Sequence, residues 1–282
     1  MFEYIKLIYY LIRPKTIFIR KFSNAMGDTL LLTIALQGIR KQNPKHKVVL
    51  EAKWHELFKN NPNFDWITDR HIRTTKRHIK PKYYLYPNST VPIYEQVSKY
   101  VSDQDVYYPK MYLDENEIGL VIEKYPYAYI VICPHGKRKF SANRKEWGID
   151  KFQVVRNHFS NIYFIQIGIK DDELLNDVID ARGENIRESA LIIKNAMFFI
   201  GLEGGLMHIA KAVGARSVII YGGFINKALS EYNENINISN MVDCSPCFSS
   251  EKKHVDCPTM KCMIGINPDK VIQEIEQEFK LM

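Results

Sequence analysis

The chain has 282 residues, of which 46% are apolar and 25% charged, and its net charge is +7. This length allows one large or two medium-sized cores, and the composition excludes collagen and intrinsic disorder. No apolar run approaches the ~18–20 residues of a membrane-spanning helix. Lys and Arg cluster at residues 13–21, 70–82 and 137–145. Such clusters suit a phosphorylated ligand or an anionic membrane as well as ordinary solvated surface, and no recognition motif supports nucleic acid.

The first twelve residues, MFEYIKLIYYLI, predict a short amphipathic helix. Lys6 and the Arg13-Pro14-Lys15 sequence resemble the flank of a signal peptide, but no small-residue cleavage site follows. We therefore expect this helix either to pack on the fold or to contact the inner surface of a membrane.

The first half of the chain predicts strands that alternate with helices. In chain order, these elements are a strand at 16–20, a helix at 29–41, a strand at 47–51, a short helix at 54–59, an extended segment at 64–67 and a helix at 114–124. Residues 70–110 have weak periodicity, and a linker is expected at Tyr125-Pro126.

The second half shows the same alternation more clearly. Strands are expected at 128–133, 163–167, 197–200 and 217–221, and helices at 150–159, 171–181, 187–195, 206–213 and 268–279. Strands that alternate with helices form parallel sheets. We therefore predict an α/β protein with two Rossmann-like domains, residues 1–125 and 126–282, which face a cleft at the carboxyl ends of their strands.

Asp28 follows a strand and the turn Asn24-Ala25-Met26-Gly27. Its carboxylate could cap the helix that begins there, or it could point into the cleft as a general base.

A basic loop follows the first strand of the second half. Its five cationic side chains suit a pyrophosphate, although a basic surface loop is the alternative. They are Lys137, Arg138, Lys139, Arg144 and Lys145.

The segment from Gly201 to His208 joins a buried strand to a helix through a carboxylate and two glycines. Gly204 and Gly205 would let backbone N–H groups approach a phosphate, and Glu203 would accept hydrogen bonds from ribose or sugar hydroxyls. His208 would point back towards the turn. In the alternative interpretation, Glu203 is a helix cap and His208 is a core histidine.

Four of the five cysteines, Cys244, Cys247, Cys257 and Cys262, lie in one loop. Their spacing suits a closed four-thiolate site for structural zinc or iron, with free thiols or disulfides as alternatives. Cys133, inside a strand, is expected to be a small core residue.

Taken together, these motifs resemble glycosyltransferase family 9, the bacterial heptosyltransferases of lipopolysaccharide assembly. The resemblance rests on motifs that occur in the family's order. These are Met26-Gly27-Asp28, Asn61-Pro62-Asn63-Phe64-Asp65, Lys145-Glu146-Trp147, Glu203-Gly204-Gly205-Leu206-Met207-His208, Ser217–Gly222, and the two cysteine-containing segments Cys244-Ser245-Pro246-Cys247 and Cys262-Met263-Ile264-Gly265-Ile266.

The resemblance implies a GT-B architecture and an inverting transfer that needs no metal or other cofactor for catalysis. Asp28 would deprotonate the acceptor hydroxyl, and Lys145 would stabilise the diphosphate leaving group. The donor would be held by a set of residues that comprises Lys137, Arg144, Glu203, Gly204, Gly205, His208 and Gly222. Two departures concern the donor sugar: Glu203 stands where the family has Asp, and Gly204 stands where it has Ser or Thr.

We therefore expect a cytoplasmic glycosyltransferase, peripheral on the inner membrane, that adds heptose or another sugar to a lipopolysaccharide, O-antigen or capsule acceptor. Its donor would be a nucleoside-diphosphate sugar, and the acceptor could also be a protein. Two alternatives are a sugar-nucleotide epimerase on the same fold and a donor-binding assembly subunit without turnover. The epimerase would isomerise the sugar nucleotide in the absence of an acceptor, whereas the subunit would bind the nucleotide without turning it over.

Overall fold

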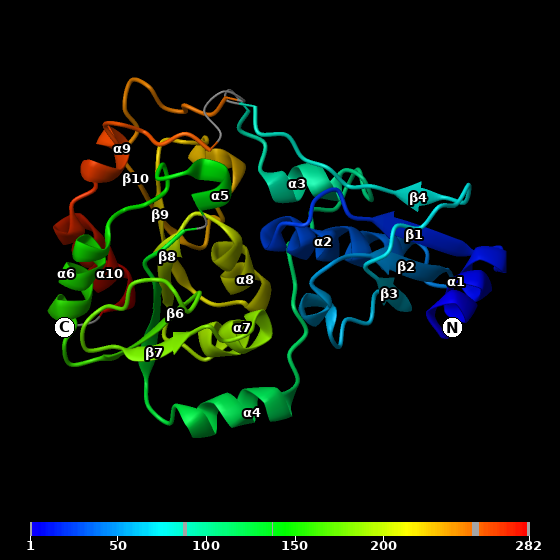
Figure 1. The fold of residues 1–282 in the computed structure, drawn as a ribbon, viewed down its shortest axis with the longest axis horizontal. Coiled ribbons are helices and arrows are strands. Elements are labelled where there is room, and N and C mark those ends of the chain that lie inside the picture. Colours follow the sequence, from blue (N-terminus) through cyan, green and yellow to red (C-terminus); the bar gives the residue numbers. More distant parts are fainter. Residues whose placement is uncertain (1, 87–88, 137, 250–253, 281–282) are drawn as a thin grey trace. The chain divides into compact units, whose positions relative to one another are not determined.

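The structure is a computed structural model that describes residues 2–86, 89–136, 138–249 and 254–280. It divides into two compact units (Figure 1). The first comprises residues 1–84 and 93–113, and the second comprises residues 85–92 and 114–282. None of the described helices is long and apolar enough to cross a membrane.

The first unit is a four-stranded parallel sheet in the order β3-β2-β1-β4. Its elements are α1 (Phe2–Ile12), β1 (Thr16–Arg20), α2 (Met26–Gln42), β2 (Lys47–Glu51), a 3₁₀ turn (His55–Phe58), β3 (Trp66–Thr68), β4 (His78–Ile79) and α3 (Ile93–Ser98). The leucine-rich α2 buries most of its side chains and ends at Asn43, before Pro44. A proline disfavours helical geometry in the residue that precedes it, which explains this end.

The second unit is a six-stranded parallel sheet in the order β10-β9-β8-β5-β6-β7. Its strands are β5 (Tyr129–Cys133), β6 (Tyr163–Gly168), β7 (Ile179–Arg182), β8 (Phe199–Leu202), β9 (Ser217–Tyr221) and β10 (Ile236–Ser239). Its helices are α4 (Glu115–Lys124), α5 (Arg138–Ser141), α6 (Ile149–His158), α7 (Ile186–Lys194), α8 (Gly205–Val213), α9 (Lys261–Ile264) and α10 (Pro268–Phe279). A 3₁₀ turn spans Lys227–Leu229.

Helices cover both faces of this sheet (Figure 1). The core between the sheet and the pair α6 and α10 contains side chains from β5, β6, β8 and β9. The helices α7 and α8 pack together on the opposite face. Because both faces are covered, the central strands are apolar throughout, and β5 and β9 are buried along their whole length. The predicted α/β class with two parallel sheets is therefore confirmed.

The described structure corrects one predicted helix and adds several short elements. The expected helix at 171–181 is wrong, because residues 171–178 form an irregular segment that leads into β7. The amide of Gln166 accepts a hydrogen bond from the backbone N–H of Leu175 and donates one to the carbonyl of Glu173, which holds this backbone in a loop. The strand expected at 197–200 lies at Phe199–Leu202. The short elements β4, α3, α5, β10 and α9 were not predicted from the sequence.

The division between the units falls between Leu113 and Asp114, whereas the sequence analysis placed the boundary at residue 125. The helix α4 therefore belongs with the second unit. An ion pair fastens it to α7: the guanidinium of Arg187 contacts the carboxylate of Glu117 at 2.5 Å, and both side chains are largely buried.

We expect Arg187→Ala to lower the free energy of unfolding of the second unit by about 3 kcal/mol, because the carboxylate of Glu117 would remain buried without its partner. Denaturant unfolding of the purified protein measures this change. Lys194→Ala, an exposed cation on the same helix, is the matched control. A loss for Arg187→Ala no larger than that of the control would show that the ion pair does not hold α4 in place.

Candidate active site

Functional groups follow three neighbouring strands of the larger sheet. The strands β8, β5 and β9 are adjacent and parallel, so the segments that follow them begin at one edge of the sheet. These segments carry Lys145, Glu203 and Gly222. Open parallel sheets bind their ligands at this edge, which makes it the candidate donor site.

Two of the predicted site residues form a salt bridge. The ammonium of Lys145 contacts the carboxylate of Glu203, and their side chains are only 15% and 8% exposed. The backbone N–H of Glu203 donates to the carbonyl of Ile220 at 3.1 Å, which fixes the carboxylate at the end of β8 against β9. The structure therefore joins the basic loop after β5 to the turn before α8.

The residues beside Lys145 are anchored on both sides. Arg144 donates through Nε to the carbonyl of Val255 at 3.0 Å. Glu146 accepts a hydrogen bond from the backbone N–H of Gly136 at 3.1 Å, and the indole of Trp147 donates to the carbonyl of Ile266 at 2.9 Å. Anchored neighbours reduce the conformational entropy that Lys145 would lose when it binds a ligand.

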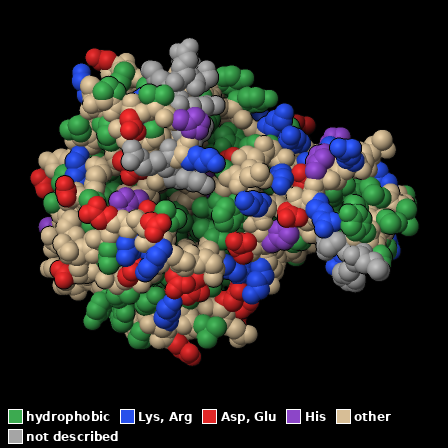
Figure 2. All heavy atoms as spheres, in the orientation of Figure 1, with side chains coloured by type: hydrophobic (Ala, Val, Ile, Leu, Met, Phe, Trp, Pro, Cys, Tyr) green, Lys and Arg blue, Asp and Glu red, His purple; other side chains and the backbone are tan. Residues whose placement is uncertain are grey.

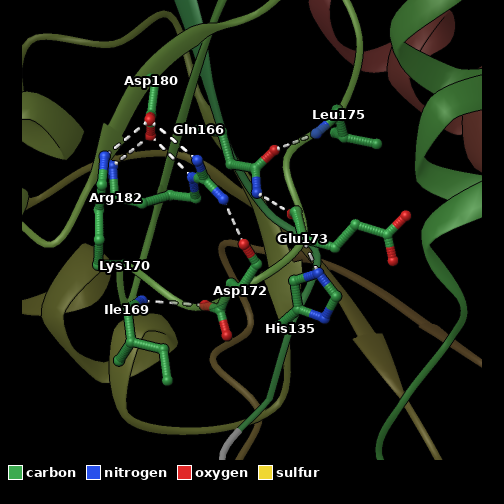
Figure 3. A network of polar contacts seen from close by, with 9 residues as sticks. All are labelled: His135, Gln166, Ile169, Lys170, Asp172, Glu173, Leu175, Asp180 and Arg182. Atoms are coloured by element: carbon green, nitrogen blue, oxygen red, sulfur yellow. Dashed lines mark hydrogen bonds and ion pairs between the residues drawn. The ribbon is translucent and has the colours of Figure 1, made fainter.

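A polar network fixes the far side of the basic loop (Figure 3). His135 lies with Nε2 at 3.2 Å from the carbonyl of Glu173, which also accepts from Gln166. Arg182 contacts the carboxylate of Asp180 at 2.8 Å, and this pairing lowers the pKa of that carboxyl below its usual range. His135 thus contacts the loop between β6 and β7.

The turn after β8 leads directly into α8, whose first-turn N–H groups have no partners within the helix. Gly204 and Gly205 precede these groups and add no side chain in front of them. Together with the helix dipole, first-turn N–H groups of this kind suit a negatively charged group, which makes this end of α8 part of the candidate donor site.

His208 lies in the first turn of α8 but is buried. Its Nδ1 lies 2.7 Å from the hydroxyl of Tyr232, and the two rings pack edge to face. Beside it, the hydroxyl of Tyr221 contacts the sulfur of Met207 at 3.0 Å. Burial, followed by the charge of Glu203, raises the pKa of Tyr221, so that its hydroxyl keeps its proton. These buried contacts hold the first turn of α8 in place.

Gly222 follows β9 and lies close to the basic loop. A methyl group there would collide with the carbonyl oxygen of Arg144. Glycine is therefore required for the close approach of the two segments. Lys137 lies outside the described residues, so its predicted role has no structural counterpart here.

The four cysteines predicted to bind metal all line one cavity in the second unit, with a volume of about 210 Å³. The backbone N–H of Met260 donates to the sulfur of Cys257 at 3.3 Å, and Nη1 of Arg144 lies 3.7 Å from the sulfur of Cys247. Among the described residues, no group of three or more His, Cys, Asp or Glu side chains is arranged to hold a metal ion.

Hydrogen bonds to the sulfur of Cys257 favour ionisation of its thiol. Burial opposes its ionisation, but N–H donors at Met260 and Thr259 outweigh burial and lower its pKa below the usual value. Thiolates are the form that binds zinc and iron. Four cysteines supply ligands of the type that zinc and iron bind, but in the described residues their sulfurs do not surround one point.

In the first unit, Asp28 lies in the first turn of α2. Ala25 is the N-cap, and Asp28 accepts a hydrogen bond of 2.6 Å from the hydroxyl of Tyr83. Asp28 therefore does not occupy the cap position. The ring of Phe22 packs edge to face on Tyr83, which places that hydroxyl. Tyr83 lies in the segment of weak periodicity, so nothing in the sequence singled it out.

Residues 181–256 match the family model described as glycosyltransferase family 9 (heptosyltransferase). Over 173 residues, the chain is 27% identical to lipooligosaccharide heptosyltransferase 2 of Campylobacter jejuni. The match covers 52% of this chain and 53% of that relative, so it spans about half the length of the curated protein.

Solved structures share the fold over nearly the whole chain. A glycosyltransferase family 9 protein of Veillonella parvula gives a TM-score of 0.75 at 16% identity and covers 94% of this chain and 97% of its own. The ADP-heptose heptosyltransferase II of E. coli gives 0.71 at 13% identity, with 94% and 98% covered.

The iron-containing, dodecameric heptosyltransferase TibC, solved with ADP-D-beta-D-heptose, gives a TM-score of 0.71 at 15% identity, with 95% of this chain and 78% of TibC covered. At these identities the likeness shows the fold. The chain is thus similar to glycosyltransferase family 9 in sequence over residues 181–256 and in fold over nearly its whole length, which confirms the resemblance predicted from its motifs.

Proposed function

We propose that this protein is an inverting glycosyltransferase, which moves a sugar from a nucleoside-diphosphate sugar to an acceptor of the lipopolysaccharide, O-antigen or capsule type. The buried Lys145–Glu203 ion pair at the start of α8 carries this proposal. It places a cation, a carboxylate and free N–H groups together, and these are the groups that a diphosphate and a sugar need. Relatives solved or named with ADP-heptose support a donor of this class.

On the donor side, Lys145 would bind the diphosphate. In the described state its ammonium is neutralised by Glu203. A bound diphosphate would compete for that ammonium and leave the carboxylate to accept hydrogen bonds from sugar hydroxyls. As the bond between the anomeric carbon and the diphosphate oxygen breaks, the leaving group takes the electron pair, and Lys145 and the helix dipole oppose its growing charge.

On the acceptor side, Asp28 would act as the general base. An acceptor hydroxyl would attack the anomeric carbon, form the new C–O bond and give its proton to Asp28. The hydrogen bond from the hydroxyl of Tyr83 to Oδ1 would orient this carboxylate. In this proposal, the first unit binds the acceptor and the second unit binds the donor, with Gly204, Gly205, His208 and Gly222 shaping the donor site.

The cysteine loop would hold a structural zinc or iron, and catalysis itself would need no cofactor. A metal there would tie the cysteines to the segment that precedes Lys145, because Asn143 exchanges hydrogen bonds with the backbone of Cys257 at 2.7 and 3.1 Å. The iron in TibC supports a metal of this kind. We propose a cytoplasmic location, peripheral to the membrane that holds the acceptor.

Lys145→Ala is expected to weaken binding of the donor nucleoside diphosphate by roughly 30-fold, because a charge-assisted contact to phosphate contributes about 2 kcal/mol. Isothermal titration calorimetry over a panel of nucleoside diphosphates measures this loss. Lys194→Ala, an exposed lysine in the last turn of α7, is the control. If both variants bind like the unmodified protein, Lys145 does not contact the diphosphate.

Asp28→Asn is expected to lower the transfer rate by at least about 100-fold and to leave donor affinity unchanged, because the amide cannot accept the acceptor's proton. Transfer is followed by mass spectrometry of an acceptor extract from cells that lack the gene. Asp69→Asn, an exposed carboxylate in the same unit, is the control. Retained transfer in Asp28→Asn would remove Asp28 from the mechanism, and isomerised sugar nucleotide without any acceptor would indicate an epimerase instead.

Freshly purified protein is expected to contain about one zinc or iron per chain, since a closed four-thiolate site binds one ion. Elemental analysis measures this content, and Cys257→Ser with Cys262→Ser should abolish it and lower the melting temperature. Cys133→Ser is the control, because that thiol lies in β5 away from the loop. Fresh protein without either metal would overturn the proposal.

A further inference from the structure

The helix α1 precedes β1 and is firmly docked on the first unit by one of its faces. Leu7, Tyr10 and Leu11 pack on a core cluster that includes Phe18 and Trp66. The ring of Tyr10 stacks on that of Trp66 with 5.6 Å between centroids, and its hydroxyl donates to the carbonyl of Asp65 at 3.3 Å. These contacts fix the rotation of the helix about its own axis and so determine which of its side chains point outward.

The outward face of α1 is apolar throughout. Its side chains are between 40% and 73% exposed, and they are Tyr4, Ile5, Ile8, Tyr9 and Ile12. The spacing of three and four residues places them on one continuous stripe. Single exposed apolar side chains are ordinary, but five on one helical face mark a surface that binds a partner.

Basic side chains border this stripe on both sides. The guanidinium of Arg13 lies over the ring of Tyr9, 4.2 Å from its centroid, and that of Arg70 lies over the ring of Tyr4 at 5.2 Å. Lys15 is exposed beyond the end of the helix, and Lys76 bonds the carbonyl of Arg13. Figure 2 shows hydrophobic side chains gathered over the region of α1, with Lys and Arg beside them.

The positive charge of the whole chain is also concentrated in the unit that contains α1. Residues 1–113 contain 19 Lys and Arg against 9 Asp and Glu, whereas residues 114–282 contain 20 against 23. The unit that carries α1 therefore holds all of the excess positive charge. A second copy of this surface would meet it with the same sign of charge, which opposes self-association through α1.

We propose that the outer face of α1 docks on an anionic lipid bilayer, with the helix lying in the plane of the interface. Its isoleucines would enter the boundary between headgroups and acyl chains, its tyrosines would lie at headgroup level, and Arg13, Lys15 and Arg70 would contact lipid phosphates. This inference extends the proposed function, which gives the contact its purpose: it would hold the first unit at the surface where a lipid-linked acceptor lies.

Flotation with phospholipid vesicles tests the contact in the absence of donor and acceptor, so its outcome is independent of whether the protein transfers sugar. The unmodified protein is expected to float with vesicles in which about one quarter of the lipid is phosphatidylglycerol, and to bind pure phosphatidylcholine at least roughly tenfold more weakly. Raising the salt concentration should weaken binding to the anionic vesicles, because salt screens the arginines and lysines.

Two sets of variants separate the apolar and the charged contributions. Ile5→Gln with Ile8→Gln, and separately Arg13→Gln with Arg70→Gln, should each lower binding by roughly tenfold or more. Leu120→Gln with Ile122→Gln is the matched control, because these side chains are similarly exposed on α4 of the other unit. All variants change exposed positions, and circular dichroism checks that they fold.

Three results would overturn the proposal. The first is equal binding to neutral and anionic vesicles, and the second is equal loss in the α1 and α4 variants. The third is a change of oligomeric state by light scattering in Ile5→Gln with Ile8→Gln without any change in vesicle binding, which would assign the face to a second copy of the chain.

Discussion

The candidate site depends on one buried ion pair, the contact between the ammonium of Lys145 and the carboxylate of Glu203. Each charge would be costly at this depth without the other. The pair can form only where the loop after β5 meets the end of β8, and the order of the parallel strands produces that meeting. The fold thus places a cation and an anion together at the edge where α/β sheets bind ligands, and in our proposal a bound diphosphate would separate them.

The cysteine loop holds in place the backbone next to the Lys145–Glu203 ion pair. Asn143 and Arg144 are bonded to backbone groups of residues 255–257, and Gly222 allows the loop after β9 to approach Arg144. Arg144 is therefore engaged with the cysteine loop, and Lys145 is the cation directed at the turn before α8. In our proposal, a structural metal in this loop would order the backbone that presents Lys145.

Local patterns in the sequence predicted the strand, turn and helix around Glu203, because an apolar run, two glycines and an amphipathic helix are signals over short range. The contact between Lys145 and Glu203 was beyond such patterns, since their segments follow different strands and meet only in the folded sheet. The helix expected at 171–181 failed for a related reason, because the buried amide of Gln166 fixes that backbone from another strand. Tyr83 lies in a segment without periodicity, so its contact with Asp28 had no signal in the sequence.

We propose that Glu203 restrains Lys145 until a donor binds, and that its carboxylate then accepts hydrogen bonds from the sugar. The direct test is calorimetry with Glu203→Gln, which compares a nucleoside diphosphate with the corresponding nucleotide sugar. We expect the diphosphate alone to bind at least as tightly as before, because the ammonium is released, whereas the extra affinity contributed by the sugar is lost. Unchanged affinities for both ligands would contradict it.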